Sequence, residues 1–429
     1  MKTLASTVLW IQLVLAAAAS AQTRPLWTLD TRAPSYGGGA IGDLAGDGNL
    51  VIVFGTYFND EHLYAVRAGD GVLLWKRKSE GGPFDASVAL VDLDGDGKLE
   101  VLAADSSTGT LFCLNHKGEV LWKHKLPNST DSPPAVAPLD GDGKPHIVVG
   151  VMALGDRHGR VIALDAATRK ERWQAKVPGH VQSEPALVDL NGDGVLDAVV
   201  TTWRGDKKVR ALNGKDGSEL WTAQMAGDMY HGVSVIPGKP PRIVAHSIAG
   251  DVCLLDAQGK DIWRRKIGGY LFGPTSVGAL AGDGKQRIVV PGPRIVVLDL
   301  EGNEIWRSPE YGSVPRGVAL ADLHGDGTLD LFFGASDRKF RILEGKTGKE
   351  LFAFDATVEG KVFEGIDSAP LIADFKGDGK LAAFFVAGRG LSDKTRPMNY
   401  GRAFALPLER GAGAWTMFRG NLRRTGSSK

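Results

Sequence analysis

The chain has 429 residues, of which 43% are hydrophobic, and its formal net charge is +1. A chain of this size can bury a large core, and its balanced charge gives no bias toward nucleic acid or an anionic membrane surface. Glycine is frequent, at 57 residues, which suits an all-β protein with many tight turns. The two cysteines, Cys113 and Cys253, lie three repeats apart, so we expect buried thiols and not a disulfide.

The amino-terminal segment, residues 1 to 21, has the pattern of a cleavable secretory signal peptide. Lys2 precedes an apolar run centred on VLWIQLVLAAAA, and small residues stand before Gln22. The run is too short to cross a bilayer comfortably, so export is favoured over anchoring and no transmembrane segment is expected. We therefore expect a secreted or periplasmic protein that is cleaved near Ala21.

The next segment, RPLWTLD with Trp27, is an isolated β-like run that precedes the first complete repeat. Eight repeats follow, each with a tight turn between two β-like runs, as in VDLNGDGVLDAVVTT (188 to 202). The first position of these turns falls at residues 43, 92, 138, 189, 235, 279, 322 and 374, so successive repeats are 43 to 52 residues apart. Four β-like runs per repeat indicate a four-stranded antiparallel sheet. The sequence therefore predicts an eight-bladed β-propeller over residues 22 to 410.

The eighth repeat ends in YGRAFALPL (400 to 408) without a clear fourth strand of its own. The isolated run around Trp27 supplies that strand, so we expect the amino-terminal strand to complete the last blade and close the ring. We expect the tail, residues 411 to 429, to pack on the exterior of the propeller. A solenoid is the alternative architecture, but the period and the lack of helical spacing argue against it.

An aromatic residue ends the fourth run in nearly every repeat. These residues are Trp75, Trp122, Trp173, Trp221, Trp263, Trp306 and Phe352. Large flat side chains at matching outer positions can pack between neighbouring blades. We therefore assign them a structural role and not a ligand-binding one.

Three of the eight turns carry oxygen-bearing side chains at the spacing of a metal-binding loop. The candidate ligands are Asp92, Asp94, Asp96 and Glu100 in the second repeat, Asp189, Asn191, Asp193 and Asp197 in the fourth, and Asp322, Asp326 and Asp330 in the seventh. Oxygens at loop positions 1, 3, 5 and 9 can converge on a hard cation when glycine at position 6 permits a sharp reversal. In the seventh loop, His324 replaces the oxygen ligand at position 3. The alternative for each loop is an Asx-Gly turn that needs no ion.

The DxDxDGxxD turns resemble the FG-GAP or VCBS-type repeats of integrin α-subunit propellers and of many bacterial exported proteins. The other half of each repeat is similar to the tryptophan-docking repeat of PQQ-type propellers, as in ALDAATRKERW (163 to 173) and ALNGKDGSELW (211 to 221). The first resemblance implies structural calcium in the acidic loops. The second does not bring a quinone cofactor with it, because quinoprotein dehydrogenases are expected to carry adjacent cysteines and a longer chain.

The face opposite the acidic loops is the predicted functional face, because its loops can vary and a funnel at the ring axis is a natural pocket. The residues that enter the inner strands there are Tyr36, Asp85, Asp131, Glu184, Tyr230, His231, Phe272, Arg316 and Asp367. Aromatic rings, carboxylates and a guanidinium together suit the binding of sugars, although any solvated rim of loops is polar.

We interpret the chain as an exported, monomeric, calcium-binding scaffold for a carbohydrate or protein ligand. The alternative is a carbohydrate-active enzyme such as a polysaccharide lyase. In that case Tyr230 and His231 would abstract a proton beside a uronic carboxylate that Arg316 holds. No Ser-His-Asp spacing, phosphate loop or zinc motif indicates a different chemistry.

Overall fold

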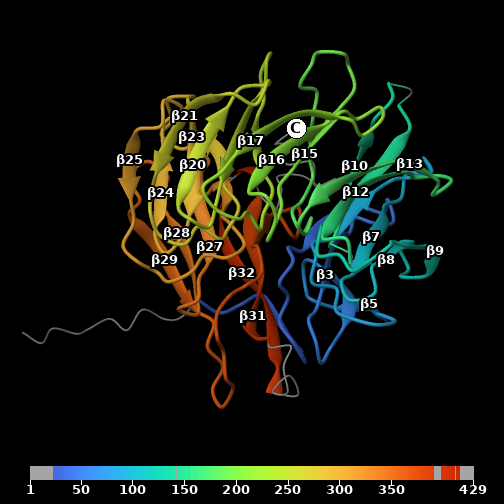
Figure 1. Cartoon of the computed structure of the whole chain (residues 1–429). Helices are drawn as coiled ribbons and strands as arrows, with labels where there is room; N and C mark the ends of the chain where they lie inside the picture. Colours follow the sequence, from blue (N-terminus) through green and yellow to red (C-terminus); the bar gives the residue numbers. More distant parts are fainter. Residues whose placement is uncertain (1–22, 142, 154, 391–397, 411, 416–429) are drawn as a thin grey trace, which may run out of the picture.

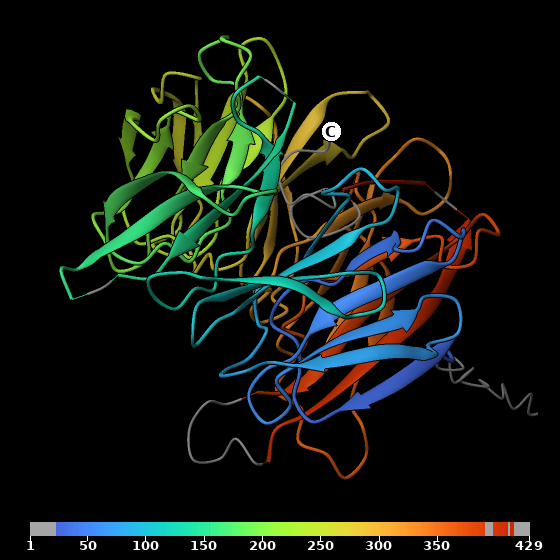
Figure 2. The same ribbon diagram turned by 90° about the vertical axis from the view of Figure 1, so that its right-hand side faces the viewer.

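The computed structural model describes residues 23–141, 143–153, 155–390, 398–410 and 412–415. Its regular elements are strands, and they form eight sheets around a central axis (Figures 1 and 2). None of the described residues forms a helix long and apolar enough to span a membrane. The predicted eight-bladed, all-β propeller is confirmed, whereas the predicted signal peptide, residues 1 to 21, lies outside the described residues.

Each blade has four antiparallel strands, and in the first four blades these strands follow one another in chain order from the axis outward. Blade 1 has β2 (Ala40–Asp43), β3 (Leu50–Gly55), β4 (His62–Arg67) and β5 (Leu73–Lys78). Blade 2 has β6 (Ala89–Val91), β7 (Glu100–Asp105), β8 (Thr110–Leu114) and β9 (Val120–Lys125). Blade 3 has β10 (Ala135–Pro138), β11 (Pro145–Val151), β12 (His158–Asp165) and β13 (Glu171–Pro178). Blade 4 has β14 (Ala186–Val188), β15 (Asp197–Val200), β16 (Lys208–Leu212) and β17 (Glu219–Gln224).

The remaining blades repeat this order, and blade 8 takes its outer strand from the amino terminus. Blade 5 has β18 (Ser234–Ile236), β19 (Arg242–His246), β20 (Asp251–Leu255) and β21 (Asp261–Lys266). Blade 6 has β22 (Ser276–Ala279), β23 (Gln286–Pro291), β24 (Ile295–Leu298) and β25 (Glu304–Arg307). Blade 7 has β26 (Ala319–Asp322), β27 (Asp330–Gly334), β28 (Lys339–Leu343) and β29 (Glu350–Asp355). Blade 8 has β30 (Leu371–Ala373), β31 (Lys380–Arg389), β32 (Tyr400–Arg410) and β1 (Trp27–Thr31).

The hydrophobic pattern differs between the inner and outer strands of a blade. In blade 2 every residue of β7, EVLAAD, is buried, because both faces of an inner strand meet neighbouring blades. The outer strand β9, VLWKHK, alternates between half-buried and exposed residues. The core is therefore a set of apolar layers between blades. Cys113 and Cys253 lie within these layers as free, buried thiols, as expected, and burial raises the pKa of each to about 12.

The ring closes between the two ends of the propeller. Strand β1 pairs antiparallel with β32, so that Trp27 lies opposite Ala405 and Thr31 opposite Gly401. Figure 2 shows the red strands of the last blade beside the blue strands of the first. This pairing confirms the predicted closure, in which the amino-terminal strand completes the last blade as its outer strand.

A repeated hydrogen bond joins neighbouring blades at the outer rim. The indole Nε1 of Trp263 on β21 donates to Leu300 O of the next blade over 2.8 Å. The same contact is made by Trp27, Trp75, Trp173, Trp221 and Trp306, whose Nε1 atoms lie 2.8 to 3.0 Å from a backbone carbonyl of the following blade. Gly302 has φ +81° and its added Cβ would lie 2.7 Å from the Trp263 ring, so this turn requires glycine. The tryptophans are interblade contacts, as predicted.

The carboxyl-terminal tail corrects one prediction. Residues Ala412–Trp415 form strand β33, which pairs with β26, the innermost strand of blade 7, and also lies against β22 and β30. These residues therefore lie on the axial side of the ring and not on its exterior. The inner edge of β26 offers backbone hydrogen-bonding groups that an added strand can satisfy, which explains the pairing. The rest of the predicted tail, residues 411 and 416 to 429, lies outside the described residues.

Candidate functional site

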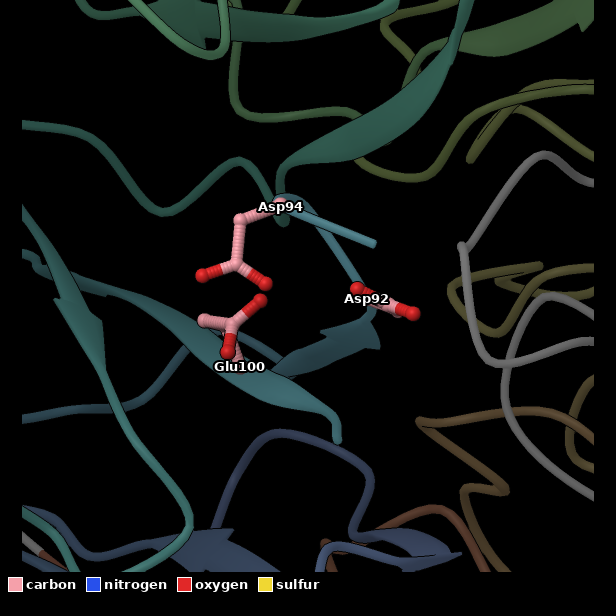
Figure 3. Close-up of side chains that lie close together, drawn as sticks. All are labelled: Asp92, Asp94 and Glu100. Carbon is pink, nitrogen blue, oxygen red and sulfur yellow. The ribbon is translucent and has the colours of Figure 1, made fainter. Parts of the chain in front are cut away.

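The acidic loop of blade 2 connects β6 to β7 and brings three of its four predicted ligands together. Oxygens of Asp92, Asp94 and Glu100 all lie within 4.8 Å of one another. In Figure 3 the carboxylates of Asp94 and Glu100 face each other, with Asp92 beside them. Glu100 is 5% exposed, and burial together with the nearby acids raises its pKa. Several carboxylate oxygens at this spacing form the kind of ligand set that calcium prefers.

The same loop is also a well-formed turn without an ion. Asp92 accepts hydrogen bonds from Gly95 N at 2.6 Å and from Gly97 N at 3.0 Å. The fourth predicted ligand, Asp96, accepts from Lys98 N at 2.8 Å and pairs with the Lys98 ammonium at 3.1 Å. Asp96 is therefore placed toward Lys98 and lies outside the group of three carboxylates. Side-chain bonds of this kind hold the loop in the shape that an Asx turn needs.

The loops of blades 4 and 7 use their acids in a similar way. Asp189 accepts from Gly192 N and Gly194 N, while Asn191 and Asp193 accept from backbone amides within the loop. At position 9, buried Asp197 accepts from Leu190 N and Gly214 N. In the seventh loop Asp322 accepts from Gly325 N and Gly327 N, Asp326 from Thr328 N, and buried Asp330 from Gly345 N. Among the described residues, only the second loop gathers three carboxylates within 4.8 Å.

Two other loops have a basic side chain at position 9, where the metal-type loops have an acid. In the sixth loop the Arg287 guanidinium lies 2.7 Å from Asp283 at position 5. In the third loop position 9 is buried His146, and Arg172 from β13 lies 2.8 Å from Asp140. The protein's own cations therefore balance these acids, which argues against calcium at both places. The absence of an acid at position 9 could be seen in the sequence, because Arg287 and His146 align with Glu100 of the second loop.

The predicted inner-strand residues lie on the opposite face, where the chain enters the inner strands. A small cavity spans six blades there, and its polar lining is Tyr36, Asp85, Ser87, Asp131, Gln182, Glu184, Tyr230 and Arg316. Its volume is about 10 Å³, which is the space that one water molecule requires. The structure thus unites residues that are far apart in sequence. Gln182 was not predicted, although it lies two residues before Glu184 on the same blade connection.

Arg316 is the guanidinium in the lining of this cavity. Its Cζ lies 5.6 Å from the ring centres of both Tyr36 and Tyr230, within the range of a cation–π contact. The pKa of Asp85 is well above its usual range because of burial and then because of the charge of Asp131. Burial also raises the pKa of Asp131 and of Asp367, although the Arg316 charge opposes both shifts. The Arg316 charge therefore offsets the burial of these carboxyl groups only in part, and a further cation nearby would favour their ionised forms.

His231 lies behind this lining. Its Nδ1 is 2.8 Å from Glu184 Oε1 and its Nε2 is 3.2 Å from Pro315 O, and the residue is 2% exposed. Burial lowers its pKa, and the Glu184 carboxylate opposes that shift. Because both ring nitrogens already face protein oxygens, the imidazole is not placed to take a proton from a bound substrate. Its geometry gives His231 a positioning role toward Glu184.

A continuous series of aromatic rings extends from the cavity. Tyr230 stacks on Phe272 with ring centres 4.6 Å apart, and Phe272 stacks on Tyr270 at 5.9 Å. Trp203 meets the edge of Tyr230 at 5.6 Å. Tyr270 is 50% exposed, so the series runs from the axis to solvent. The exposed ring of Tyr270, at the end of this series, offers a surface on which a ligand ring can stack.

Comparison with known families supports the prediction of PQQ-like repeats. The family profile described as "Outer membrane protein assembly factor BamB" matches residues 107–271, and the profile described as "Lambda-carrageenase beta-propeller domain" matches residues 51–156. The serine/threonine-protein kinase AfsK of Streptomyces griseus is 30% identical over 164 residues, which are 38% of this chain and 19% of AfsK. The chain therefore spans about a fifth of the length of that relative.

Solved structures with the same fold belong to differently named proteins. The V. cholerae biofilm matrix protein Bap1 has a TM-score of 0.67 at 15% identity, covering 94% of this chain and 96% of that chain. A europium-containing methanol dehydrogenase has a TM-score of 0.64 at 14% identity, covering 90% and 93%. Saccharomyces cerevisiae Sqt1 has a TM-score of 0.64 at 12% identity, covering 91% and 100%. At these identities the likeness shows the fold alone. The comparisons thus support a β-propeller with PQQ-like, BamB-type repeats, and the FG-GAP or VCBS resemblance stays a prediction.

Proposed function

We propose that this chain is an exported, calcium-stabilised propeller that binds carbohydrate on the face opposite its acidic loops. The observation that carries the proposal is the aromatic series from Tyr230 to the exposed ring of Tyr270, which is continuous with the polar cavity at the axis. A sugar ring has apolar C–H faces and polar edges, so it fits a surface that combines stacked rings with carboxylate, amide and guanidinium groups.

The match to the λ-carrageenase propeller profile supports a carbohydrate over a protein ligand. The matched segment, residues 51–156, includes Asp85 and Asp131 of the cavity lining. One of the proteins with the same fold is a biofilm matrix protein. Secretion, as the signal-like segment at residues 1 to 21 predicts, would place this chain where polysaccharides occur.

Calcium belongs to the proposal as a structural ion. The second loop fits it best, with Asp92, Asp94 and Glu100 as ligands, and the fourth and seventh loops are further candidates. The ion would offset the mutual repulsion of the gathered carboxylates and stiffen the connection between the first two strands of its blade. This role is distant from the cavity, because the loops follow the inner strands and the cavity residues precede them.

We propose binding and not lyase catalysis, because His231, the general base of the alternative, is engaged by Glu184 and Pro315. Burial also raises the pKa of Tyr230, so its phenol keeps its proton more strongly than a free tyrosine and is a poor base at neutral pH. Arg316 is held among carboxylates that would repel a uronic acid group.

The proposal is tested by screening neutral, acidic and amino oligosaccharides for binding, while the solutions are monitored for the absorbance of an unsaturated product. Tyr270→Ala should weaken the binding of any sugar that the wild type binds, by about 0.5 to 1.5 kcal/mol, because a stacking surface is lost. Ile262→Ala is the matched control, since Ile262 is 49% exposed but lies on the outer strand β21. Equal effects of the two changes, or turnover by the wild type, would contradict the proposal.

A further inference from the structure

The axial cavity contains buried polar atoms that have no partner among the described residues. They are the acceptors Asp85 Oδ1 and Gln182 Oε1 and the donor Arg316 Nε. Nearly all buried polar atoms in proteins make hydrogen bonds, and those that do not are costly unless a ligand or water satisfies them. These three atoms come from blades 2, 4 and 7, so they converge on the cavity from different sides.

The size of the cavity limits what can satisfy these atoms. A volume of about 10 Å³ admits one group of the size of water, so a whole sugar ring is excluded. Two acceptors without partners require a group that offers more than one N–H or O–H. A water molecule carries two donors and no charge, whereas a primary ammonium of the same size carries three donors and a positive charge.

The charged residues that line the cavity also favour a bound cation. The carboxylates of Asp85, Asp131 and Glu184 line the cavity with the Arg316 guanidinium as their counter-ion. A second cation would be attracted to the ionised forms of both Asp85 and Asp131, whereas a carboxylate or sulfate would be repelled by both.

We propose that the cavity binds the free primary ammonium of an amino sugar, whose ring stacks on the aromatic surface that begins at Tyr230. This inference rests on the proposed carbohydrate-binding function and names its ligand class. The ammonium donates to Asp85 Oδ1 and to Gln182 Oε1. N-acetylation removes the charge and adds bulk that the cavity cannot admit, so the site discriminates against the acetylated sugar.

The test is calorimetric titration of the full chain at about pH 6 with two matched oligosaccharides, a tetramer of glucosamine and the same tetramer fully N-acetylated. The wild type should bind the free amine at least about 10-fold more tightly, as expected for charge-assisted hydrogen bonds. Asp85→Asn and Asp131→Asn should each remove most of that preference. Asp216→Asn, an exposed carboxylate in the turn before β17, is the control and should keep it.

Each other outcome has a defined meaning. Equal binding of the two tetramers overturns the ammonium site, because the cavity then holds only a water, but leaves the carbohydrate function in place. Binding of a capped lysine tetrapeptide without binding of either tetramer overturns the amino-sugar ligand in favour of a protein partner. Preference that persists in both Asn variants, with melting temperatures showing folded protein, overturns the assignment of the site to Asp85 and Asp131.

Discussion

Equivalent positions of the repeat carry nearly constant residues at the outer rim of this propeller and variable residues at its axis. At the rim, tryptophans at equivalent positions make the same indole-to-carbonyl hydrogen bond to the next blade, including Trp27 across the closure. At the axis, the residues that enter the inner strands differ from blade to blade, from tyrosine to aspartate to arginine. Where nearly every blade keeps the same residue, that residue builds the scaffold. Where the blades diverge, a site of mixed chemistry forms.

Opening the ring is expected to have the largest effect on the scaffold. Deleting residues 23 to 31 removes β1, which leaves β32 as an exposed edge and takes away the Trp27 contact to Ala68 O. The variant should aggregate or lose its cooperative melting transition. Light scattering and circular dichroism measure both, and a deletion variant that melts like the parent would contradict closure by β1.

A single rim contact should have the next largest effect. Trp263 is 7% exposed, and Trp263→Ala should lower the free energy of unfolding by about 3 to 5 kcal/mol, because it opens a gap between blades 5 and 6. Denaturant unfolding measures the change. Trp263→Phe, which keeps most of the apolar area and loses the hydrogen bond, should cost about 0.5 to 1.5 kcal/mol. If Trp263→Ala lowers the free energy of unfolding no more than Trp263→Phe does, then the packing of the Trp263 ring contributes little to stability.

These rim and ring features could be predicted from the sequence because they repeat. Tryptophan spacing, glycine turns and the missing fourth strand of the last repeat each have a local physical cause that a single repeat displays. The tail could not be predicted in this way, since the pairing of Ala412–Trp415 with β26 depends on an edge that exists only after the ring has formed. The segment carries no turn or repeat signal of its own.

The site was predictable only in part. The entry residues Tyr36, Asp85 and Arg316 follow from their place before each inner strand. The size of the cavity, the contribution of Gln182 and the burial of His231 against Glu184 depend on side-chain packing across blades, which no local pattern encodes. For the same reason Asp96 looked equivalent to Asp94, although it pairs with Lys98.

Calcium should add a smaller increment of stability than the rim contacts. If a loop has the affinity of about 0.1 to 1 mM that is common in extracellular modules, about 10 mM calcium stabilises by about 1.4 to 2.7 kcal/mol per site. Glu100→Gln should reduce the calcium-dependent shift in melting temperature. Arg287→Gln, at the same position of the sixth loop, should leave the shift unchanged. A melting temperature that excess chelator does not alter would contradict calcium in all three acidic loops.

Removing the buried ionisable group of Asp85 at the axis should have the smallest effect on stability. The pKa of Asp85 is raised in the folded protein, so its contribution to stability is greatest at low pH and is lost as the pH rises through the folded pKa. Asparagine does not ionise, so the Asp85→Asn variant avoids this fall in stability at high pH. The variant should therefore be more stable than the wild type at about pH 8, and the difference should shrink toward about pH 4. A difference that grows as the pH falls would mean that Asp85 stabilises the fold as a carboxylate.

The most direct test of carbohydrate binding on the axial face is hydrogen–deuterium exchange of the full chain with and without the glucosamine tetramer. We predict that ligand protection is confined to the connections that enter the inner strands, above all residues 225–233 and 267–275, which carry Tyr230, Tyr270 and Phe272. The acidic loop at residues 92–100 and the outer strands should exchange at unchanged rates. Protection centred on the acidic loops or on the outer strands, with none at residues 225–233 and 267–275, would contradict the account.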